Sequence, residues 1–314
     1  MAHEGLREAL DRMKAALLLD RGVIKIAGEG ARNFLHGLVT VDILNLTPGA
    51  ARFTALLTPQ GKIIADFIVV EAAANGGGFF LDIPRTFGAS LVEKFNLYKL
   101  RAKVTIEDLS GSLGVLAAWD GDGTTKQGLS YRDPRLPALG LRAMSAPQLA
   151  GSAAADLGAA LVDAREYEEH RIALGVPRGG VDFSYGDAFP HETDMDQLGG
   201  VDFTKGCYVG QEVVSRIEHR GTARTRAVPI RYDGAAPEAG AAIMAGERQV
   251  GTMGSAMGGR GLALLRLDRV ADALALGEPL TGGGVPIHLV KPNWARFAFP
   301  GEAAGAAGAA KVAE

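Results

Sequence analysis

The sequence lacks the features that define disulfide-stapled, membrane-spanning or nucleic-acid-binding proteins. It has one cysteine in 314 residues, so no disulfide forms within the chain, which suits a reducing compartment. No apolar stretch approaches the ~20 residues that cross a bilayer. The N-terminal run from Ala15 to Leu19 is cut by Asp20 and follows acidic residues, unlike a signal peptide. A formal net charge of -3 gives no reason to expect a nucleic-acid-binding surface. We therefore predict a cytoplasmic protein without a membrane partner.

Several patterns that mark catalytic or metal-binding proteins are also missing. The Gly-rich runs at 76–78, 258–259 and 282–284 match neither a Walker loop nor a dinucleotide-binding fingerprint, so we interpret them as turns. The histidines show no HExxH pattern and no paired spacing with the cysteine, so we predict no metal site. One thiolate cannot hold a cluster that normally takes four, so other ligands or other chains would have to help.

The apolar pattern switches between helix and strand periods without a regular order. One face of a predicted helix carries apolar residues at helical spacing: Ala31, Phe34, Leu35 and Leu38. Another helix is predicted around 87–95. Strands are predicted at 23–26, 53–57, 62–71, 79–83 and 100–107. Because strands and helices mix without repeated βαβ units, we predict an α+β fold with mixed antiparallel sheets.

The chain is long enough for two or three core units. We predict a loose, partly helical lead-in at 1–20, an α+β domain at 21–110, a second α+β domain at 111–222, a β-barrel-like module at 223–299 and a disordered tail at 300–314. The second domain is expected to contain strands at 113–119 and 139–144, a helix at 164–174 and a long surface loop at 176–204. The C-terminal module follows from short strands separated by Gly and Pro, at 228–232, 243–244, 249–253, 261–267 and 286–289.

The most informative stretch is KGCYVGQE, residues 205–212, which holds the only cysteine. Lys205 lies two positions before Cys207, and nearby positive charge favours the thiolate, the reactive form of a thiol. Apolar residues recur at helical spacing after the motif, which places the cysteine in the turn before a helix. A lone cysteine is commonly a small buried hydrophobe. Here its polar and glycine neighbours favour an exposed, reactive thiol instead.

KGCYVGQE, followed by VVSR and HRG, resembles the signature of the YgfZ family. Those proteins bind folate, are related to the T-protein (aminomethyltransferase) of the glycine cleavage system, and are linked to iron–sulfur cluster assembly or maintenance. Weaker similarity runs through HGLVTVDI, PQGKIIADF, YKLRAKV and RIALGVP. The resemblance implies a GcvT-like fold in which two α+β units and a C-terminal β module enclose a cavity for tetrahydrofolate.

The resemblance also implies which residues form the site. Cys207 and Lys205 would carry the chemistry. The folate would be held by Asp66, Arg101, Asp42, Tyr208, Gln211, Glu212 and Arg216. TPQGKIIADF resembles the T-protein hairpin that carries two adjacent aspartates, one of which assists folate chemistry, and Asp66 matches the second of the pair. Ala65 replaces the first aspartate, which weakens the case for folate-dependent catalysis but not for folate binding.

Two functions follow from these observations. The first is a folate-binding accessory protein for iron–sulfur cluster assembly or repair, with client or assembly proteins as partners. The alternative is a tetrahydrofolate-dependent aminomethyl or methyl transferase, and whether any reaction is catalysed stays open. The basic run from Arg216 to Arg226 is either a solvated connection or an attractor for an acidic partner, a folate polyglutamate tail or RNA. Nucleic acid ranks last because no aromatic residues interleave with the charges.

Overall fold

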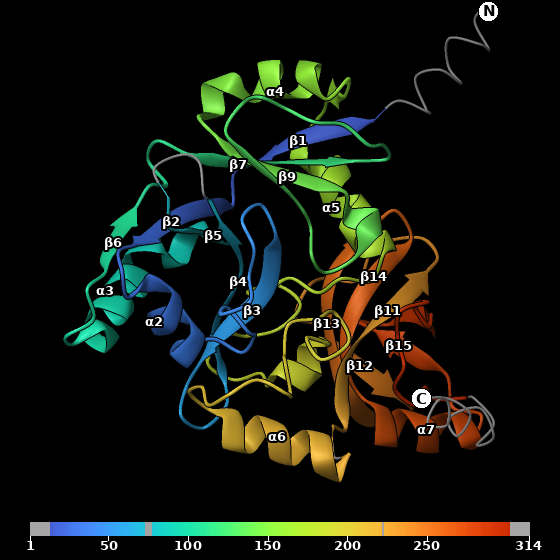
Figure 1. The fold of residues 1–314 in the computed structure, drawn as a ribbon. Helices are drawn as coiled ribbons and strands as arrows, with labels where there is room; N and C mark the ends of the chain where they lie inside the picture. The colour runs from blue at the N-terminus through green and yellow to red at the C-terminus, as the bar shows by residue number, and fades with distance from the viewer. Residues whose placement is uncertain (1–12, 73–76, 222, 302–314) are drawn as a thin grey trace, which may run out of the picture. The chain divides into compact units, whose positions relative to one another are not determined.

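The computed structural model describes residues 13–72, 77–221 and 223–301 (Figure 1). The chain divides into two compact units. Unit 1 is Met1–His170 with Leu198–Glu212, and unit 2 is Arg171–Gln197 with Val213–Glu314. The first part of the predicted lead-in and nearly all of the predicted tail lie outside the described residues. None of the helices in the described ranges has the length and apolar character needed to span a bilayer.

Unit 1 contains a five-stranded antiparallel sheet that carries the predicted hairpins. In spatial order its strands are β3 (Ala51–Leu57), β4 (Ile63–Glu71), β5 (Phe79–Pro84), β2 (Arg21–Ala27) and β6 (Thr105–Asp108). One face packs on helices α2 (Ala31–Leu38) and α3 (Gly88–Lys99), beside the sheet in Figure 1. Leu35 and Phe95, both fully buried, join these helices to the core. The predicted helix at 31–38 is confirmed, because its apolar spacing matches the buried face.

One predicted strand of this sheet is shorter than expected. The sequence pattern predicted a strand over 100–107, but β6 begins at Thr105. Leu100 has a positive φ of 44° and ends α3, and Val104 donates to the carbonyl of Ala102 in a tight turn. Residues 100–104, the first half of the predicted strand, therefore lie in the end of α3 and this turn.

The second sheet of unit 1 also has five strands. Its spatial order is β10 (Ala160–Leu161), β1 (Lys14–Leu18), β7 (Gly114–Trp119), β9 (Leu141–Ser145) and β8 (Leu129–Arg132). The expectation of a loose, partly helical lead-in is wrong for residues 14–18. Ala15 and Ala16 are fully buried, and β1 pairs with both β7 and β10. Its small apolar residues carry no alternation, so only tertiary pairing identifies the strand. Helix α4 (Ala150–Asp156) packs on this sheet.

The two sheets of unit 1 face each other through a buried polar network. Asp82 on β5 accepts hydrogen bonds from Arg142 Nη1 on β9 at 2.6 Å and from the Tyr131 hydroxyl on β8 at 3.0 Å. Arg21 Nε donates to the same carboxylate at 2.6 Å. Asp133 binds the other side of Arg142 at 2.8 Å. Each buried charge therefore has an opposite charge beside it, as burial requires.

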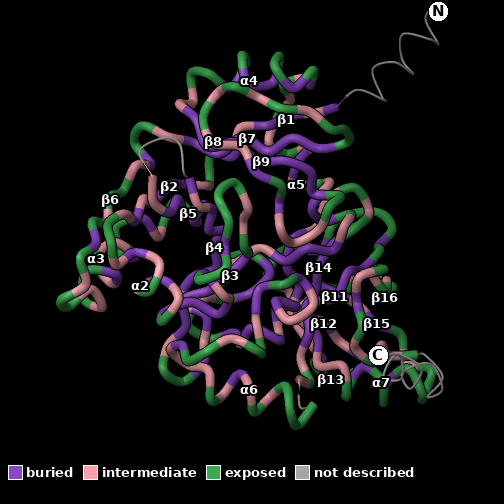
Figure 2. The backbone as a smooth tube through the Cα atoms, viewed as in Figure 1, coloured by how far each residue is buried: buried purple, intermediate pink, exposed green. Residues whose placement is uncertain are grey.

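Unit 2 contains a closed six-stranded barrel, as the short C-terminal strands predicted. Around the barrel the order is β11 (Thr225–Tyr232), β14 (Arg260–Arg266), β13 (Arg248–Met257), β12 (Ala242–Ala245), β15 (Leu280–Gly282) and β16 (Val285–Leu289). Helix α7 (Leu267–Ala275) contributes Val270 and Ala273 to the barrel core. The barrel strands β11 and β14 are mostly buried, whereas helix α6 (Gln211–Arg220) is largely exposed or half-buried (Figure 2).

The predicted surface loop over 176–204 is only partly a surface element. Its residues up to Gln197 belong to unit 2 and contain the short 3₁₀ helix η4 (Pro190–Thr193). Asp182 is buried, accepts from Arg171 Nη1 at 2.9 Å and from the backbone N–H of Ser255 at 2.6 Å. Polar contacts of this kind replace the periodic apolar face of a helix, so the buried loop has no periodic signal in the sequence. The predicted α+β architecture with a C-terminal β module is confirmed.

Candidate functional site

Cys207 lies on an exposed segment that leads into helix α6. The segment belongs to unit 1, and α6 begins at Gln211, as the apolar spacing after the motif predicted. An exposed thiol is not one of the buried packing cysteines that are common in proteins. The solvent-facing position is the one that a nucleophile or a shared ligand requires.

Lys205 anchors the cysteine segment to the C-terminal end of helix α2. Its Nζ donates to the carbonyl oxygens of His36 and Val39, both at 2.6 Å. These carbonyls belong to the last turn and the C-cap of α2, where no intrahelical donor is available and the helix dipole favours a cation. Burial lowers the pKa of Lys205 to about 8, against smaller opposing effects of Asp42, Asp202 and Cys207. The ammonium therefore holds the loop, and its charge is directed mainly at α2.

His36 and Asp42 lie beside the anchored lysine. The His36 Nδ1 is 3.2 Å from an Asp42 carboxylate oxygen. Burial, and then the positive charge of Lys205, lowers the pKa of His36, so the imidazole is neutral at pH 7. Burial acts against ionisation of Asp42, but hydrogen bonds from Asn45 and backbone N–H groups outweigh it and lower the pKa of Asp42. A Cβ on Gly206 would lie 3.7 Å from His36 Nε2, so the ring sits against the cysteine loop.

A second set of hydrogen bonds fixes the start of the cysteine segment. The buried Thr40 hydroxyl donates to the Gly200 carbonyl at 2.6 Å and accepts from the Ala55 backbone N–H at 3.0 Å. The Asp202 backbone N–H donates to the Thr40 carbonyl at 2.9 Å. The Asp202 side chain in turn accepts from both the N–H and the hydroxyl of Thr204. Strand β3, the chain after α2 and the cysteine segment are thereby held together.

Gly210 packs the end of the motif against the β3–β4 turn. Its φ is +83°, and an added Cβ would lie 2.6 Å from the Thr58 carbonyl oxygen and 3.1 Å from the Gly61 Cα. Only glycine combines this backbone conformation with so close an approach. The motif and the hairpin that bears Asp66 therefore belong to one framework.

Tyr208 is the buried member of the motif, at 7% exposed. Burial, and then the charge of Asp202, raises the pKa of Tyr208 to about 12. The Lys205 Nζ lies 5.0 Å from the centre of its ring, within range of a cation–π contact. Within the described part of the chain, the Tyr208 hydroxyl has no hydrogen-bond partner. An unsatisfied buried hydroxyl is uncommon and marks a place where a ligand group could bind.

The other predicted site residues lie on several different elements. Gln211 and Glu212 open helix α6 in unit 1, whereas Arg216 lies further along the same helix in unit 2. Asp66 is buried on β4, opposite Ala55, and its charge acts on Arg21 of the polar network. Arg101 is exposed after α3, and in the described ranges no hydrogen bond or ion pair joins it to another predicted site residue. The structure thus brings Lys205, Tyr208 and Asp42 together.

Two residues that contact the cysteine segment were not among the predicted site residues. His36 lies against the cysteine loop, and Thr40 joins that loop to β3. Both belong to the HGLVTVDI segment, in which Asp42 alone was singled out. Their role depends on contacts with residues 160 or more positions away, which no local pattern reports.

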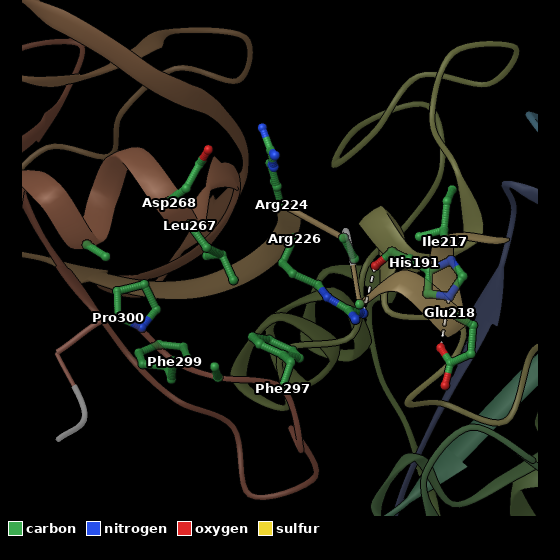
Figure 3. A pocket seen from close by; sticks show the side chains of 14 residues that line it. His191, Ile217, Glu218, Arg224, Arg226, Leu267, Asp268, Phe297, Phe299 and Pro300 are labelled. Atoms are coloured by element: carbon green, nitrogen blue, oxygen red, sulfur yellow. Dashed lines mark hydrogen bonds and ion pairs between the residues drawn. The ribbon is translucent and has the colours of Figure 1, made fainter. Parts of the chain in front are cut away.

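Unit 2 carries a separate cavity of about 420 Å³ between α6, the start of β11, α7 and the chain near Phe297 (Figure 3). Arg226 is buried there. Its guanidinium donates to both Asp196 oxygens at 2.6 and 3.0 Å, and Phe297 lies 4.7 Å from it. Arg226 is therefore not part of an exposed basic run. The predicted attraction of acidic partners would depend on the other basic residues of that run. His191, Asp196 and Glu218 bring possible metal ligands within 4.8 Å of one another, but the Arg226 charge opposes a cation there.

Comparison with known proteins identifies the family. Residues 13–119 match the GCVT N-terminal domain, and residues 224–297 match the CAF17 C-terminal beta-barrel domain. The chain is 34% identical over 291 residues to the mitochondrial iron–sulfur cluster assembly factor IBA57 homolog of Pyricularia oryzae, covering 83% of this chain and 74% of that protein. The chain belongs to the IBA57 family.

Other IBA57 proteins support the same assignment. The human mitochondrial iron–sulfur cluster assembly factor IBA57 is 29% identical over 301 residues, covering 87% of this chain and 83% of that protein. The IBA57 homolog of Mycosarcoma maydis is 36% identical over 233 residues, but the chain spans only 57% of its length. The predicted link to iron–sulfur cluster assembly factors is confirmed at the level of the family, which is IBA57 rather than the predicted YgfZ.

The fold of this IBA57 family member is that of the T-protein. The crystal structure of glycine cleavage system aminomethyltransferase T from Bartonella henselae matches with a TM-score of 0.71 and 16% identity, covering 92% of this chain and 89% of that one. The predicted GcvT-like fold is confirmed. The predicted cytoplasmic location is contradicted, because these IBA57 relatives are mitochondrial proteins. The location had been predicted from the lack of a signal peptide and of a disulfide, and a reducing compartment is not unique to the cytoplasm.

Proposed function

We propose that this protein acts in the assembly or repair of iron–sulfur clusters with Cys207 as its reactive thiol. The observation that carries the proposal is an exposed thiol on a firmly held loop. Lys205 ties the loop to α2, Thr40 ties it to β3, and Gly210 packs it on the β3–β4 turn. A sulfur held in a fixed position can be presented to a partner without a large ordering cost.

The cluster is the cargo in this proposal, and Cys207 supplies one of its ligands. Clusters normally take four thiolates, and the sequence has one cysteine. The other ligands come from an assembly or client protein, or from small thiols. The protein is therefore expected to hold a cluster only together with a second thiol source.

We propose further that a reduced folate binds to unit 1. Asp66 and Tyr208 fit such a ligand: a carboxylate pairs with the N–H donors of a pterin ring, and the Tyr208 hydroxyl lacks a partner among the described residues. Gly210 joins the two regions by packing the motif on the turn that precedes Asp66. Bound folate would supply a carrier for one-carbon groups. Five further residues remain predicted contacts of this ligand: Asp42, Arg101, Gln211, Glu212 and Arg216.

The transferase alternative is weaker than the assembly function. Ala65 of β4 stands where the T-protein resemblance would place the first aspartate, and its side chain is fully buried in the hydrophobic core. A carboxylate at this position would be desolvated without a partner, which is costly. The fold at this position therefore favours folate binding without the paired-aspartate chemistry.

The cluster role is tested by anaerobic reconstitution with ferrous iron, sulfide and glutathione. We expect the wild type to retain the visible absorption of thiolate-bound iron through gel filtration, and Cys207→Ser to lose it. Replacing sulfur by oxygen changes little volume at this exposed site, so the stability of the variant should change by less than about 0.5 kcal/mol. Ser90→Ala, at an exposed position of α3, serves as the matched control. Equal cluster retention by Cys207→Ser would refute the role of the thiol.

The folate proposal is tested by calorimetric titration with tetrahydrofolate under anaerobic conditions. We expect saturable binding, weakened by Tyr208→Phe, which keeps the ring and removes only the hydroxyl. A hydrogen bond to a ligand contributes about 1 kcal/mol, or roughly fivefold in affinity. If the wild type gives no heat of binding at millimolar tetrahydrofolate, the folate proposal is refuted. The cluster proposal is unaffected by that result.

A further inference from the structure

Unit 1 has a second cavity, of about 430 Å³, that lies between its two sheets and shares no lining residue with the Cys207 site. One wall is a row across three neighbouring strands of the first sheet: Phe80 on β5, Lys25 on β2 and Glu107 on β6. The opposite wall comes from the second sheet, with Leu129 on β8 and Met144 and Ser145 on β9. The volume falls within the range of small-molecule sites, about 300–1,000 Å³.

The cavity continues the layer that the polar network fills. Alternate residues of a strand point to the same side. Phe80 therefore lies on the same face as Asp82, and Met144 on the same face as Arg142. Around Asp82 the long side chain of Arg142 bridges the two sheets. Two residues further along the strands the side chains do not bridge, and the space between the sheets stays open.

The rim of the cavity carries one cation and one anion that are not paired. Lys25 and Glu107 are direct cross-strand partners. In the part of the chain that the structure describes, neither forms an ion pair with the other or with a third residue. Instead the Lys25 Nζ lies 5.4 Å from the centre of the Phe80 ring. Both charges are thus available to a ligand that enters between them.

We propose that this cavity binds a free α-amino acid with an apolar side chain. The ligand carboxylate would pair with Lys25 and the ammonium with Glu107, while the side chain packs on Phe80, Leu129 and Met144. A ligand with only one charge would meet a like charge at the rim, which lowers its affinity. A neutral apolar ligand would leave both charges without a partner. A zwitterion with an apolar side chain provides a partner for both charges and for the apolar wall.

The test uses protein labelled with ¹³C at the methionine methyl groups, titrated with L-phenylalanine and L-leucine. The Met144 signal is assigned with Met144→Leu. We expect a saturable shift of this signal with at least one amino acid. The matched acids and amines, hydrocinnamate with phenethylamine and isocaproate with isoamylamine, should bind about tenfold or more weakly, because each loses a charge-assisted hydrogen bond.

Variants locate the effect at the rim. Lys25→Met and Glu107→Gln should each weaken amino-acid binding about tenfold. Lys103→Met and Glu29→Gln remove the same charges from an exposed ion pair elsewhere in unit 1 and should leave binding unchanged. No movement of the Met144 signal with either amino acid, or equal affinity for the single-charge compounds, would overturn the proposal.

Discussion

Lys205 and Val39 are 166 residues apart in the sequence, yet the lysine Nζ donates to the Val39 carbonyl oxygen across 2.6 Å. This contact, with its companion to His36, makes the cysteine segment an extension of the C-terminal end of α2. The lysine of the motif thus has a structural task in addition to any effect on the thiol. The same contact links protonation of one side chain to the stability of the loop.

The first prediction concerns the pH dependence of stability in Lys205→Met. The pKa of Lys205 is about 8 in the folded protein, below its ordinary 10.5, because burial disfavours the charged form. Between these values the unfolded chain binds more protons than the folded one, so the lysine's contribution to stability rises with pH and is lost as pH falls through 8. We expect the wild type to gain about 1–2 kcal/mol over the variant between pH 8 and 10.5, after allowance for solvent screening.

Urea unfolding at a series of pH values measures this difference. Lys103→Met, at an exposed lysine of the same unit, is the control and should show a difference that does not change with pH. A constant difference for Lys205→Met over the same range would show that the ammonium is not buried in the folded state.

The second prediction compares two glycines with nearly the same backbone conformation. Gly210 has φ +83° and close neighbours, whereas Gly49 has φ +81° and nothing within 4 Å of an added Cβ. Gly49→Ala should cost only the left-handed backbone penalty, about 1–2 kcal/mol. Gly210→Ala adds the clash with the Thr58 carbonyl and should cost at least about 1 kcal/mol more. Chemical denaturation of both variants measures the difference, and equal losses would contradict the close packing.

The third prediction concerns the charge at the centre of the buried network. Asp82→Asn leaves the guanidinium groups of Arg21 and Arg142 without their shared anion, which should cost about 3–5 kcal/mol. Burial alone would raise the pKa of Asp82, but the two arginines outweigh it and lower the value. The stabilisation is therefore full above the ordinary pKa of a carboxyl and is lost as the pH falls below it.

Thermal unfolding across the acid range tests this network. The difference between wild type and Asp82→Asn should shrink as the pH drops below about 4. Asp122→Asn removes an exposed ion pair with Arg132 and should change stability by no more than about 0.5 kcal/mol at any pH. A similar small effect for Asp82→Asn would mean that the network is not needed to hold the sheets.

The fourth prediction concerns the accessibility and activation of Cys207. Because the residue is exposed, iodoacetamide should alkylate the folded protein at one site, at a rate within about tenfold of that for the unfolded chain. The hypothesis that Lys205 activates the thiol is tested by Lys205→Met, which should then slow alkylation at neutral pH. Mass spectrometry of timed samples measures both rates. Protection of Cys207 in the folded wild type would contradict its exposure. An unchanged alkylation rate in Lys205→Met would contradict activation of the thiol by the lysine.

Local sequence patterns predicted the elements whose stability depends on near neighbours. The buried face of α2 and the short barrel strands were visible as apolar spacing broken by glycine. The same reasoning missed β1, because the run around Ala15 and Ala16 has no alternation when both faces are buried. The first half of the predicted strand at 100–107 was wrong for a different reason. The turn after Leu100 depends on a positive φ, which apolar spacing does not report.

The candidate site was only partly predictable. The composition of the motif located Cys207 and its exposed position, and it singled out Lys205. The partners of Lys205, which are backbone carbonyls of α2, have no side-chain identity that a sequence could display. His36 and Thr40 were missed for the same reason, since their contacts span the whole of unit 1. Long-range hydrogen bonds therefore define the part of the site that the sequence does not reveal.

The order in which the chain enters its two units has a consequence for its biosynthesis. The chain leaves unit 1 at His170, builds part of unit 2, and returns with Leu198–Glu212. Because proteins emerge from the ribosome N-terminus first, the sheets of unit 1 are made long before the segment that bears Cys207. The thiol can reach its anchored position only after some two-thirds of the chain has been synthesised. A nascent or truncated chain that ends before this segment would contain most of unit 1 and no cysteine.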